Sequence, residues 1–474
     1  MIIIPANTLS TGGYEVANSC RFDKASSPSL SKTSGTPTNA LKWTFSAWVK
    51  ISNIGNDTFL LDFNTDGNNR SQIGFQDTDK AIIVYEKVSG STSQLLQTSA
   101  QFRDPSAWLN IVVSCDRTLG TDTERTKIYV NGTRVTSFST ADGGPNYPAQ
   151  NTNGIINTAV STLIGKYSQS TLFYDGYMCE VVFIDGTAYD ASNFGEFDED
   201  SPTIWKPKDP SGLTFGTNGF YLDFEDSSNL GNDANGGTDF TETNIVAADQ
   251  ATDTCTNNFA TMNPLDNIGA TTFSEGNNKL LWTATNKTNK STIGVTAGKW
   301  YAECKAIDVN SGTSGTLIGV GGPEALASTY LNGAHISGWG YRVQTGNIQN
   351  SAGNEAYGDT WAEDDIIGVA LDMDNGFVYM SKNGTFQDSG DPTSGSSGTN
   401  AANNQPSYGS AISGTEFFAC SAYDTDSLAW NFGGCPSFAI SSGNADADGY
   451  GNFEYAPPTG YYALCTKNLA EYGG

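Results

Sequence analysis

Two Asn-Gly pairs near residue 380 constrain the fold more than any other feature of the chain. They lie in the segment GVALDMDNGFVYMSKNGTF (residues 368–386), as Asn375-Gly376 and Asn383-Gly384, and apolar residues alternate with small or polar ones around them. A two-residue hairpin turn of type I′ needs positive φ at both central positions, which Asn and Gly tolerate. Alternation with period two places successive side chains on opposite faces of a strand. The segment is therefore predicted to form antiparallel strands and not a helix.

The same pattern occurs in the first half of the chain. The segment LNIVVSCDRTLGTDTERTKIYVNGTRV (residues 109–135) reads as a strand, a polar loop and a second strand that ends at Asn131-Gly132. A composition with 53 Gly, 24 Phe, 21 Tyr and 9 Trp is typical of short strands joined by turns. With 474 residues, the chain has room for roughly two or three domains. We predict an all-β protein with two antiparallel β-sandwich (jelly-roll-like) domains in tandem.

Four regions are expected along the chain. Residues 1–14 form an N-terminal arm, and residues 15–210 contain the strands of the first domain. Residues 211–263 are polar and glycine-rich apart from GFYLDF, so they are predicted to form a connecting seam with one added strand. Residues 264–474 form the second domain and a C-terminal tail.

The charge balance argues against two classes of partner. The chain has 51 acidic and 24 basic residues and a formal net charge of -27, so phosphate backbones are repelled and nucleic acid is not an expected partner. No stretch approaches the roughly 18 apolar residues of a membrane span, so membrane insertion is not expected. The N-terminal MIIIPANTL has neither a basic region nor a small-residue cleavage site, and it is not expected to act as a signal peptide.

The cysteines and the single histidine do not form a zinc-binding pattern. The eight cysteines are widely spaced without any C-x-x-C pair, and His335 is the only imidazole. In a reducing cytoplasm we expect thiols, which behave as small buried hydrophobes. Disulfides are the alternative.

Segments of the first domain resemble the concanavalin A-like, laminin-G-like jelly roll: WTFSAWVK, WLNIVVSCD, KIYVNGTRV and FYDGYMCEVVFIDGTAYD. Many members of that family bind glycans or calcium, so the resemblance implies a binding function. The family usually has Gly-x-x-Asp-Glu-Val before the last inner strand, whereas this chain has Gly176, Cys179, Glu180 and Val181. The cysteine in place of aspartate argues against an inherited calcium site.

Segments of the second domain resemble the SPRY fold, a bent antiparallel sandwich, and occur in the order expected for it. The opening hairpin would then be the central hairpin of that fold. The segments are GKWYAECKAI, IGVGG, SGWGYRV, YGDTWAEDDIIGVALDMDNGFVYMSKNGTF and AWNFGG.

Nearly the whole chain is similar to structural proteins of marine tailed bacteriophages. The similarity extends to EVVFIDGTAYDASNFGEFDEDSPTIWKPK, to TDTCTNNFATMNPLD in the seam and to the tail GNFEYAPPTGYYALCTKNLAEYGG. It implies a component of the virion surface, on the tail or the capsid, made in the host cytoplasm.

One acidic run deserves comparison with a catalytic pattern. Some jelly-roll relatives hydrolyse glucans with carboxylates at alternate positions of one strand, and Glu196, Asp198 and Asp200 have that spacing. Gly195 precedes the run and Ser201-Pro202 follows it, which favours an acidic surface loop. No phosphate-binding loop is present, and a lone histidine in a glycine-rich segment is usually a loop residue. We predict that the protein is not an enzyme.

Two sets of residues are candidates for binding. In SGWGYRV, Trp339, Tyr341 and Arg342 would offer aromatic faces and a cation to a sugar, and core packing is the alternative for both rings. Trp361 is expected to pack in the core. Calcium is the only cofactor considered, with oxygen ligands from three loop aspartates, although acidic clusters arise by chance in such a chain. These aspartates are Asp62, Asp66 and Asp175.

Three functions remain after this reading. The first is a non-enzymatic virion structural protein, a fibre or decoration protein that adheres to a host-surface glycan. The alternatives are a glycoside hydrolase or lyase on a jelly-roll scaffold and a secreted bacterial lectin. Other virion proteins and further copies of the chain are the expected partners, since Ile2, Ile3 and Ile4 are too few for a core but would bury against a neighbour. The arm would otherwise add an edge strand to its own domain.

Overall fold

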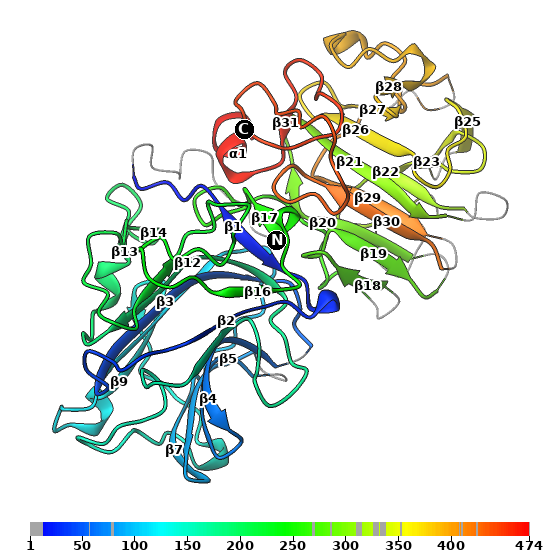
Figure 1. The fold of residues 1–474 in the computed structure, drawn as a ribbon. Coiled ribbons are helices and arrows are strands. Elements are labelled where there is room, and N and C mark those ends of the chain that lie inside the picture. Colours follow the sequence, from blue (N-terminus) through cyan, green and yellow to red (C-terminus); the bar gives the residue numbers. More distant parts are fainter. Residues whose placement is uncertain are drawn as a thin grey trace. The chain divides into compact units, whose positions relative to one another are not determined.

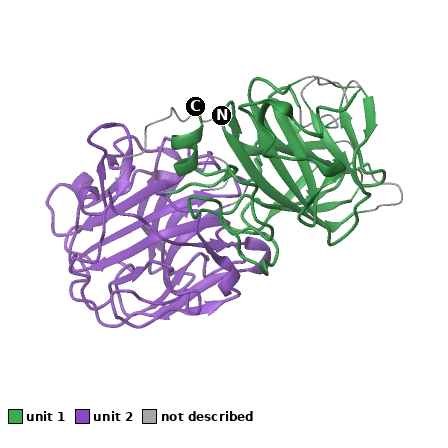
Figure 2. Cartoon of the chain, turned by 90° about the horizontal axis from the view of Figure 1, so that it is seen from above, with its two compact units in different colours: residues 1–9, 257–474 green, residues 10–256 purple. Residues whose placement is uncertain are grey.

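The protein folds into two compact units of β-structure, and a computed structural model describes most of both (Figure 1). The first unit spans residues 10–256, which are purple and keyed as unit 2 in Figure 2, and the second contains residues 257–474, which are green and keyed as unit 1. The structure describes residues 13–55, 57–76, 80–267, 271–284, 287–309, 315–325, 331, 338–350, 353–406, 408, 411–422 and 425–473.

The first unit is a sandwich of two antiparallel sheets. One sheet has the order β10-β9-β8-β3-β12-β1-β17, with β15 paired to β12, and the other has the order β16-β2-β11-β4-β5-β6-β7. The strands of the first sheet are β1 (Ser19–Phe22), β3 (Lys42–Ile51), β8 (Leu109–Asp116), β9 (Thr126–Val130), β10 (Thr133–Arg134), β12 (Gly176–Asp185), β15 (Phe220–Leu222) and β17 (Gln250–Ala251). Those of the second are β2 (Ser29–Thr33), β4 (Thr58–Asp66), β5 (Asn69–Phe75), β6 (Ile82–Val88), β7 (Ser91–Gln97), β11 (Ser161–Ile164) and β16 (Thr241–Thr243).

Alternating side chains along β3 explain how the sandwich closes. Trp43 and Phe45 are fully buried in the core between the sheets, together with residues of the facing strand β4. Phe183 of β12 joins the two layers, with its ring centroid 5.4 Å from that of Phe63. The period-two pattern of the sequence is thus the pattern of one core-facing row of side chains.

The predicted seam differs most from expectation. Residues 211–263 were expected to connect the two domains, but they contribute β15, β16 and β17 to the two sheets of the first unit. The chain divides after Thr256. The sequence predicts only GFYLDF as a strand, because the other two strands are short and mostly polar and show no apolar alternation.

The second unit is also built from two main sheets. One has the order β18-β19-β30-β21-β26-β27-β28 and the other β20-β29-β22-β23-β24-β25, all antiparallel, and β31 pairs in parallel with β21. The first contains β18 (Thr271–Ser274), β19 (Lys279–Trp282), β21 (Lys299–Asp308), β26 (Ile366–Asp372), β27 (Phe377–Lys382), β28 (Thr385–Phe386), β30 (Ser427–Asn431) and β31 (Tyr462–Ala463). The second contains β20 (Lys287–Val295), β22 (Leu317–Gly321), β23 (Trp339–Arg342), β24 (Asn347–Asn350), β25 (Gly353–Ala356) and β29 (Glu416–Ala422).

The all-β prediction with two antiparallel sandwiches is confirmed. Among the described residues the only α-helix is α1 (Thr466–Tyr472), near the C-terminus. A short hairpin, β13 (Gly195–Phe197) with β14 (Trp205–Pro207), lies outside the two sheets of the first unit.

The hairpin predicted around Asn375-Gly376 is formed by β26 and β27, but its turn is wider than predicted. Asp372 pairs with Phe377, so four residues separate the strands, and only Gly376 has a positive φ, of 76°. The Asp372 carboxylate accepts hydrogen bonds from the backbone N–H of Asn375 at 3.0 Å and from its side-chain amide at 2.8 Å, which holds this wider loop. By contrast, both residues of Asn383-Gly384 have positive φ, as the type I′ prediction requires.

Candidate functional site

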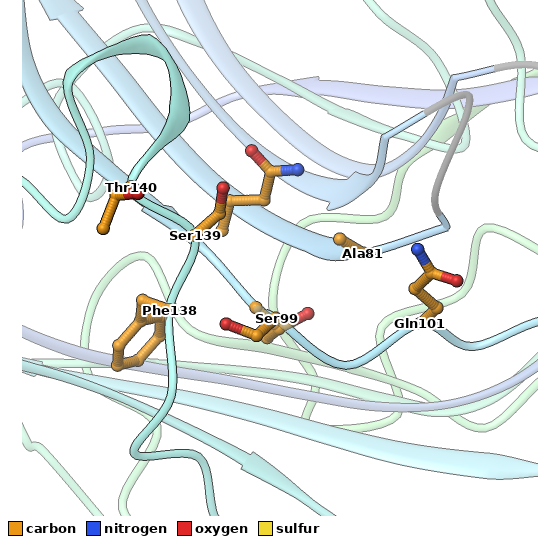
Figure 3. A pocket seen from close by; sticks show the side chains of 8 residues that line it. Ala81, Ser99, Gln101, Phe138, Ser139 and Thr140 are labelled. Atoms are coloured by element: carbon orange, nitrogen blue, oxygen red, sulfur yellow. The ribbon is translucent and has the colours of Figure 1, made fainter.

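A polar pocket lies in the first unit, beside the end of β7 (Figure 3). Its volume is about 350 Å³. One wall continues from β7 and the other comes from the segment that follows β10, about forty residues later in the chain. The lining residues are Ala81, Gln97, Thr98, Ser99, Gln101, Phe138, Ser139 and Thr140.

Backbone pairing fixes these two walls against each other. The N–H of Ser139 donates to the carbonyl of Gln97 at 2.8 Å, and the N–H of Ser99 donates to the carbonyl of Ser137 at 3.1 Å. Thr98 and Phe138 are partners in an antiparallel bridge between the two segments. The pocket is therefore built on paired backbone.

Some polar groups that line the pocket keep donors or acceptors that are available to a ligand. Gln97 is 8% exposed, and its side-chain amide makes no hydrogen bond to another described residue. The hydroxyl of Ser99 accepts a hydrogen bond from Ser137 at 3.0 Å, which leaves its own proton for a ligand. Thr98 is already engaged, since its hydroxyl accepts from the N–H of Ile82 at 3.0 Å and donates to the carbonyl of Ala100 at 2.8 Å.

One aromatic ring completes the pocket. Phe138 is half-buried and packs edge-on against Tyr147, with ring centroids 6.3 Å apart. None of the lining residues carries a charge. Uncharged amide and hydroxyl groups beside an aromatic ring are suited to bind a neutral, hydroxyl-rich molecule. They include no acid, base or activated nucleophile that would perform a reaction.

The two aromatic residues predicted to bind sugar are buried in the second unit. Trp339 is 3% exposed and lies edge-on to Tyr408, with ring centroids 4.9 Å apart. Tyr341 is 0% exposed, and its hydroxyl donates to the carbonyl of Asp359. Both lie in the core cluster with Trp361, whose predicted packing role is confirmed. Neither ring face is open for stacking, so these residues do not form the exposed platform that the sequence suggested.

Arg342, the third residue of that group, lies at the end of β23 and is half-buried. Its guanidinium donates to the side-chain carbonyl of Gln344 at 2.9 Å. His335 lies outside the residues that the structure describes.

The three predicted calcium ligands have separate surroundings. Asp62 is buried on β4 and accepts hydrogen bonds from Asn64, Gln72 and Ser168, and burial raises its pKa. Asp66 caps an exposed turn, where the backbone N–H of Asn68 lowers its pKa.

Asp175, the third of these aspartates, precedes β12. Burial, followed by the neighbouring charge of Asp23, raises its pKa to about 6. Within the described part of the chain, no group of three or more His, Cys, Asp or Glu side chains is placed to hold a metal ion.

The acidic run on which hydrolytic chemistry would depend is ion-paired. Glu196 lies on β13, half-exposed, with its carboxylate 3.7 Å from the ammonium group of Lys206 and 3.8 Å from that of Lys208. Asp198 is buried and accepts from the backbone N–H groups of Asp200 and Ser201 at 3.0 and 2.9 Å. Lys206 also lies 3.4 Å from Asp198. These contacts hold the β13–β14 hairpin, which the sequence had suggested as a plain loop.

Sequence reasoning missed the pocket and one buried acidic group. Glu180 interrupts β12 at a bulge, with a φ of 51°, and accepts from the hydroxyls of Tyr221 at 2.8 Å and Tyr14 at 3.2 Å. Burial raises the pKa of Glu180 to about 8. The signal for Glu180 was its position in the jelly-roll motif. The pocket has no such signal, because its two walls meet only in the folded chain.

None of the helices in the described residues is both long and apolar enough to cross a membrane.

Two family models match the chain. Residues 24–191 match the concanavalin A-like lectin/glucanases superfamily, and residues 299–398 match the SPRY domain. The first match contains the pocket and the second contains the β26–β27 hairpin, so both resemblances inferred from sequence are confirmed at the level of domains. A search of curated proteins gives no match.

Three solved structures show partial likeness. The SPRY domain of human HERC1 is 17% identical, with a TM-score of 0.29, and the match covers 38% of this chain and 99% of that one. A protein of Bacteroides ovatus described as "a putative carbohydrate binding protein" is 15% identical, with a TM-score of 0.32, over 48% of this chain and 59% of that one. A heptameric SAP-like pentraxin of Limulus polyphemus is 12% identical, with a TM-score of 0.26, over 37% of this chain and 80% of that one.

Proposed function

We propose that this protein is a non-enzymatic binding protein whose ligand is a neutral carbohydrate, held in the pocket beside β7. The observation that carries the proposal is the Gln97 side chain, which is 8% exposed, lines the pocket and has no partner among the described residues. Neither atom of its amide is among the fully buried polar atoms that lack a partner, so water in the pocket satisfies the amide in the free protein. A ligand that replaces this water must supply a hydrogen bond in its place, which favours a hydroxyl-rich ligand.

The rest of the lining supports a sugar over other ligands. Ser99 and Thr140 add hydroxyls and Phe138 adds a ring, and no charged side chain favours an anion or a cation. A sugar presents hydroxyls at its edge and C–H groups on its face, which matches amide and hydroxyl groups beside an aromatic ring. The match of residues 24–191 to the concanavalin A-like lectin/glucanases superfamily agrees with a carbohydrate as the ligand.

A glycan array followed by titration calorimetry with the best neutral oligosaccharide tests this function. Gln97→Ala and Phe138→Ala should each weaken binding by roughly five-fold or more, since each removes about 1 kcal/mol of hydrogen bonding or ring contact. Gln150→Ala and Phe197→Ala are the matched controls, because both residues are exposed in the same unit and lie outside the pocket. Binding that survives both pocket variants, or that is lost equally in the controls, contradicts the proposal.

The alternative hydrolase or lyase is tested by one variant pair. Turnover of a polysaccharide that disappears in Glu196→Ala/Asp198→Ala would favour it. We expect neither turnover nor any change in glycan binding, because both carboxylates are held by Lys206.

We further propose that the protein is carried on the surface of a tailed bacteriophage particle, on the tail or the capsid, where the pocket would contact a host glycan. The support for this location is the resemblance to phage structural proteins inferred from the sequence alone. Mass spectrometry of purified particles tests it, with imaging of particles labelled through this chain. Absence of the chain from washed particles contradicts it.

Assembly into a homo-oligomer through the N-terminal arm belongs to the same proposal. Residues 1–12, including the three isoleucines, lie outside the described residues, so the support is the sequence alone. Deletion of residues 1–10 should leave the melting temperature unchanged and abolish association in analytical ultracentrifugation. A destabilised monomer that still associates would instead place the arm in its own domain.

A further inference from the structure

Two cysteines of the first unit lie in contact. The sulfur of Cys179 is 3.7 Å from that of Cys255, although 76 positions separate them in sequence. Cys179 is fully buried on β12, where it pairs with Trp48 of β3. Cys255 is half-buried and follows β17 near the end of the unit.

Contacts on both sides of Cys255 hold its segment in place. The buried carboxylate of Asp253 accepts from the ammonium group of Lys50 at 2.7 Å and from the indole N–H of Trp108 at 3.0 Å. On the other side, the hydroxyl of Thr256 accepts from the N–H of Val16 at 3.1 Å. Because its neighbours are anchored, Cys255 is held against β12.

We propose that Cys179 and Cys255 form a modification site, at which exposure to a disulfide oxidant creates an intramolecular disulfide. The sulfurs must approach from 3.7 Å to the ~2.05 Å of the bond, a movement of about 1.7 Å. Rotation of two side chains about their Cα–Cβ bonds supplies movements of this size. The proposal depends on these two side chains and not on the carbohydrate pocket.

The reaction balances with oxidised glutathione as the oxidant. Cys255 is the less buried of the two cysteines, so its thiolate attacks one glutathione sulfur, breaks that disulfide and releases one glutathione thiolate. The Cys179 thiolate then attacks the Cys255 sulfur and releases the second glutathione. Two protein thiols lose two electrons and two protons, and one glutathione disulfide becomes two glutathione thiols.

The structure also indicates how the rate should depend on pH. Burial, followed by the contact with Cys179, raises the pKa of the Cys255 thiol. Little thiolate is then present at neutral pH, and the thiolate is the reactive form. The disulfide should form slowly at neutral pH and faster as the pH rises.

The test uses the full-length reduced chain incubated with oxidised glutathione at slightly alkaline pH. After free thiols are blocked, the intact mass should show one disulfide, and digestion should give a peptide linking residues 179 and 255. The melting temperature of the first unit should rise by roughly 5 to 15 °C, because the bond closes a long loop in the unfolded chain. A reductant should reverse both changes.

Variants decide between this bond and unrelated oxidation. Cys179→Ala and Cys255→Ala should each abolish the linked peptide and the thermal shift. Cys115→Ala is the matched control, because Cys115 is a buried cysteine of the same unit on β8, and it should behave as the parent does. A persistent glutathione adduct on Cys255, a link between other cysteines or an unchanged mass would each overturn the proposal.

Discussion

Glu86 of the first unit and Glu416 of the second are each 1% exposed on a β-strand, yet their surroundings are opposite. Glu86 forms an ion pair with Arg117 at 2.9 Å and also accepts from Ser71, Ser93 and the N–H of Ile155. Neither carboxyl oxygen of Glu416 has a hydrogen-bond partner among the described residues.

The comparison shows two ways of burying the same side chain. A carboxylate is accepted inside a protein when a cation and hydrogen-bond donors replace water. Without them the carboxyl group keeps its proton, and burial, followed by the charge of Glu324, raises the pKa of Glu416 to about 9. Glu86 is therefore buried as part of an ion pair, and Glu416 is buried as a neutral acid.

The largest effect is expected when the ion pair is broken. Arg117→Met leaves the Glu86 carboxylate buried without its cation, which should lower the free energy of unfolding by about 3–5 kcal/mol at neutral pH. Urea denaturation of the first unit measures it, and Glu86→Gln in the same chain should recover much of the loss. Arg134→Met is the control, because Arg134 pairs with Glu124 with both side chains more than one-third exposed. If Arg117→Met lowers the free energy of unfolding by less than about 1 kcal/mol, the buried pair contributes no more than an exposed pair does.

The next effect is a pH dependence of the second unit. Since the folded-state pKa of Glu416 lies above its ordinary value, the folded chain binds one proton more than the unfolded chain between the two values. The resulting stability is complete below about pH 4.5 and is lost as the pH rises through about 9, by about 1.4 kcal/mol per pH unit. Between roughly pH 6 and 8 the free energy of unfolding of the parent should fall by about 2–3 kcal/mol through this group, and Glu416→Gln should abolish that fall.

Glu363→Gln is the control for this variant, because Glu363 is exposed in the same unit. If the difference in unfolding free energy between Glu416→Gln and the parent is the same at both pH values, the pKa of the Glu416 carboxyl is not raised by burial.

Glu303 on β21 sharpens the comparison because it is intermediate. It is buried and forms no ion pair with a described residue, but it accepts from the backbone N–H groups of Glu454 and Tyr455 at 2.9 and 2.7 Å. Burial raises its pKa to about 7, less than for Glu416 because these donors stabilise the charged form. Relative to the parent, Glu303→Gln should gain roughly 1–2 kcal/mol between about pH 5.5 and 7 and then level off. A gain that continues to pH 9 would show that the backbone donors contribute nothing.

The smallest effect is expected at the surface. Glu196→Ala removes a half-exposed carboxylate 3.7 Å from Lys206, and such pairs are worth roughly 0–1 kcal/mol. Thermal unfolding should change by less than about 2 °C, and added salt should reduce the difference further. A larger loss would mean that the β13–β14 hairpin depends on this contact.

The strands were predictable where one face of the sheet determines the pattern. The alternation in β3 and β26 is visible in the sequence because apolar side chains at every second position face a core. The type I′ prediction for Asn375-Gly376 was wrong, because the Asp372 side chain accepts hydrogen bonds from Asn375 and holds a wider loop. The Asn-Gly rule leaves this side-chain contact out. The strands β16 and β17 were missed because they are short and mostly polar, so they show no apolar alternation in the sequence.

The site was less predictable than the fold. Trp339 and Tyr341 alternate as an exposed face would, but sequence does not say what covers a strand, and here the core does. Gln97 and Phe138 belong to segments that are ordinary when read separately. They can be recognised as candidate binding residues only after β-pairing in the folded chain has brought them to one pocket.

The position of β1 has a consequence for how the chain is made. β1 ends at Phe22 and pairs with β12, which begins at Gly176, and with β17, which begins at Gln250, as the neighbouring blue and green strands of Figure 1 show. At synthesis rates of about 5–20 residues per second, the ribosome needs roughly 10–45 seconds after β1 to supply the last of these partners. Until then both edges of β1 are unpaired in the nascent chain, and they are open to binding by chaperones or by neighbouring nascent chains.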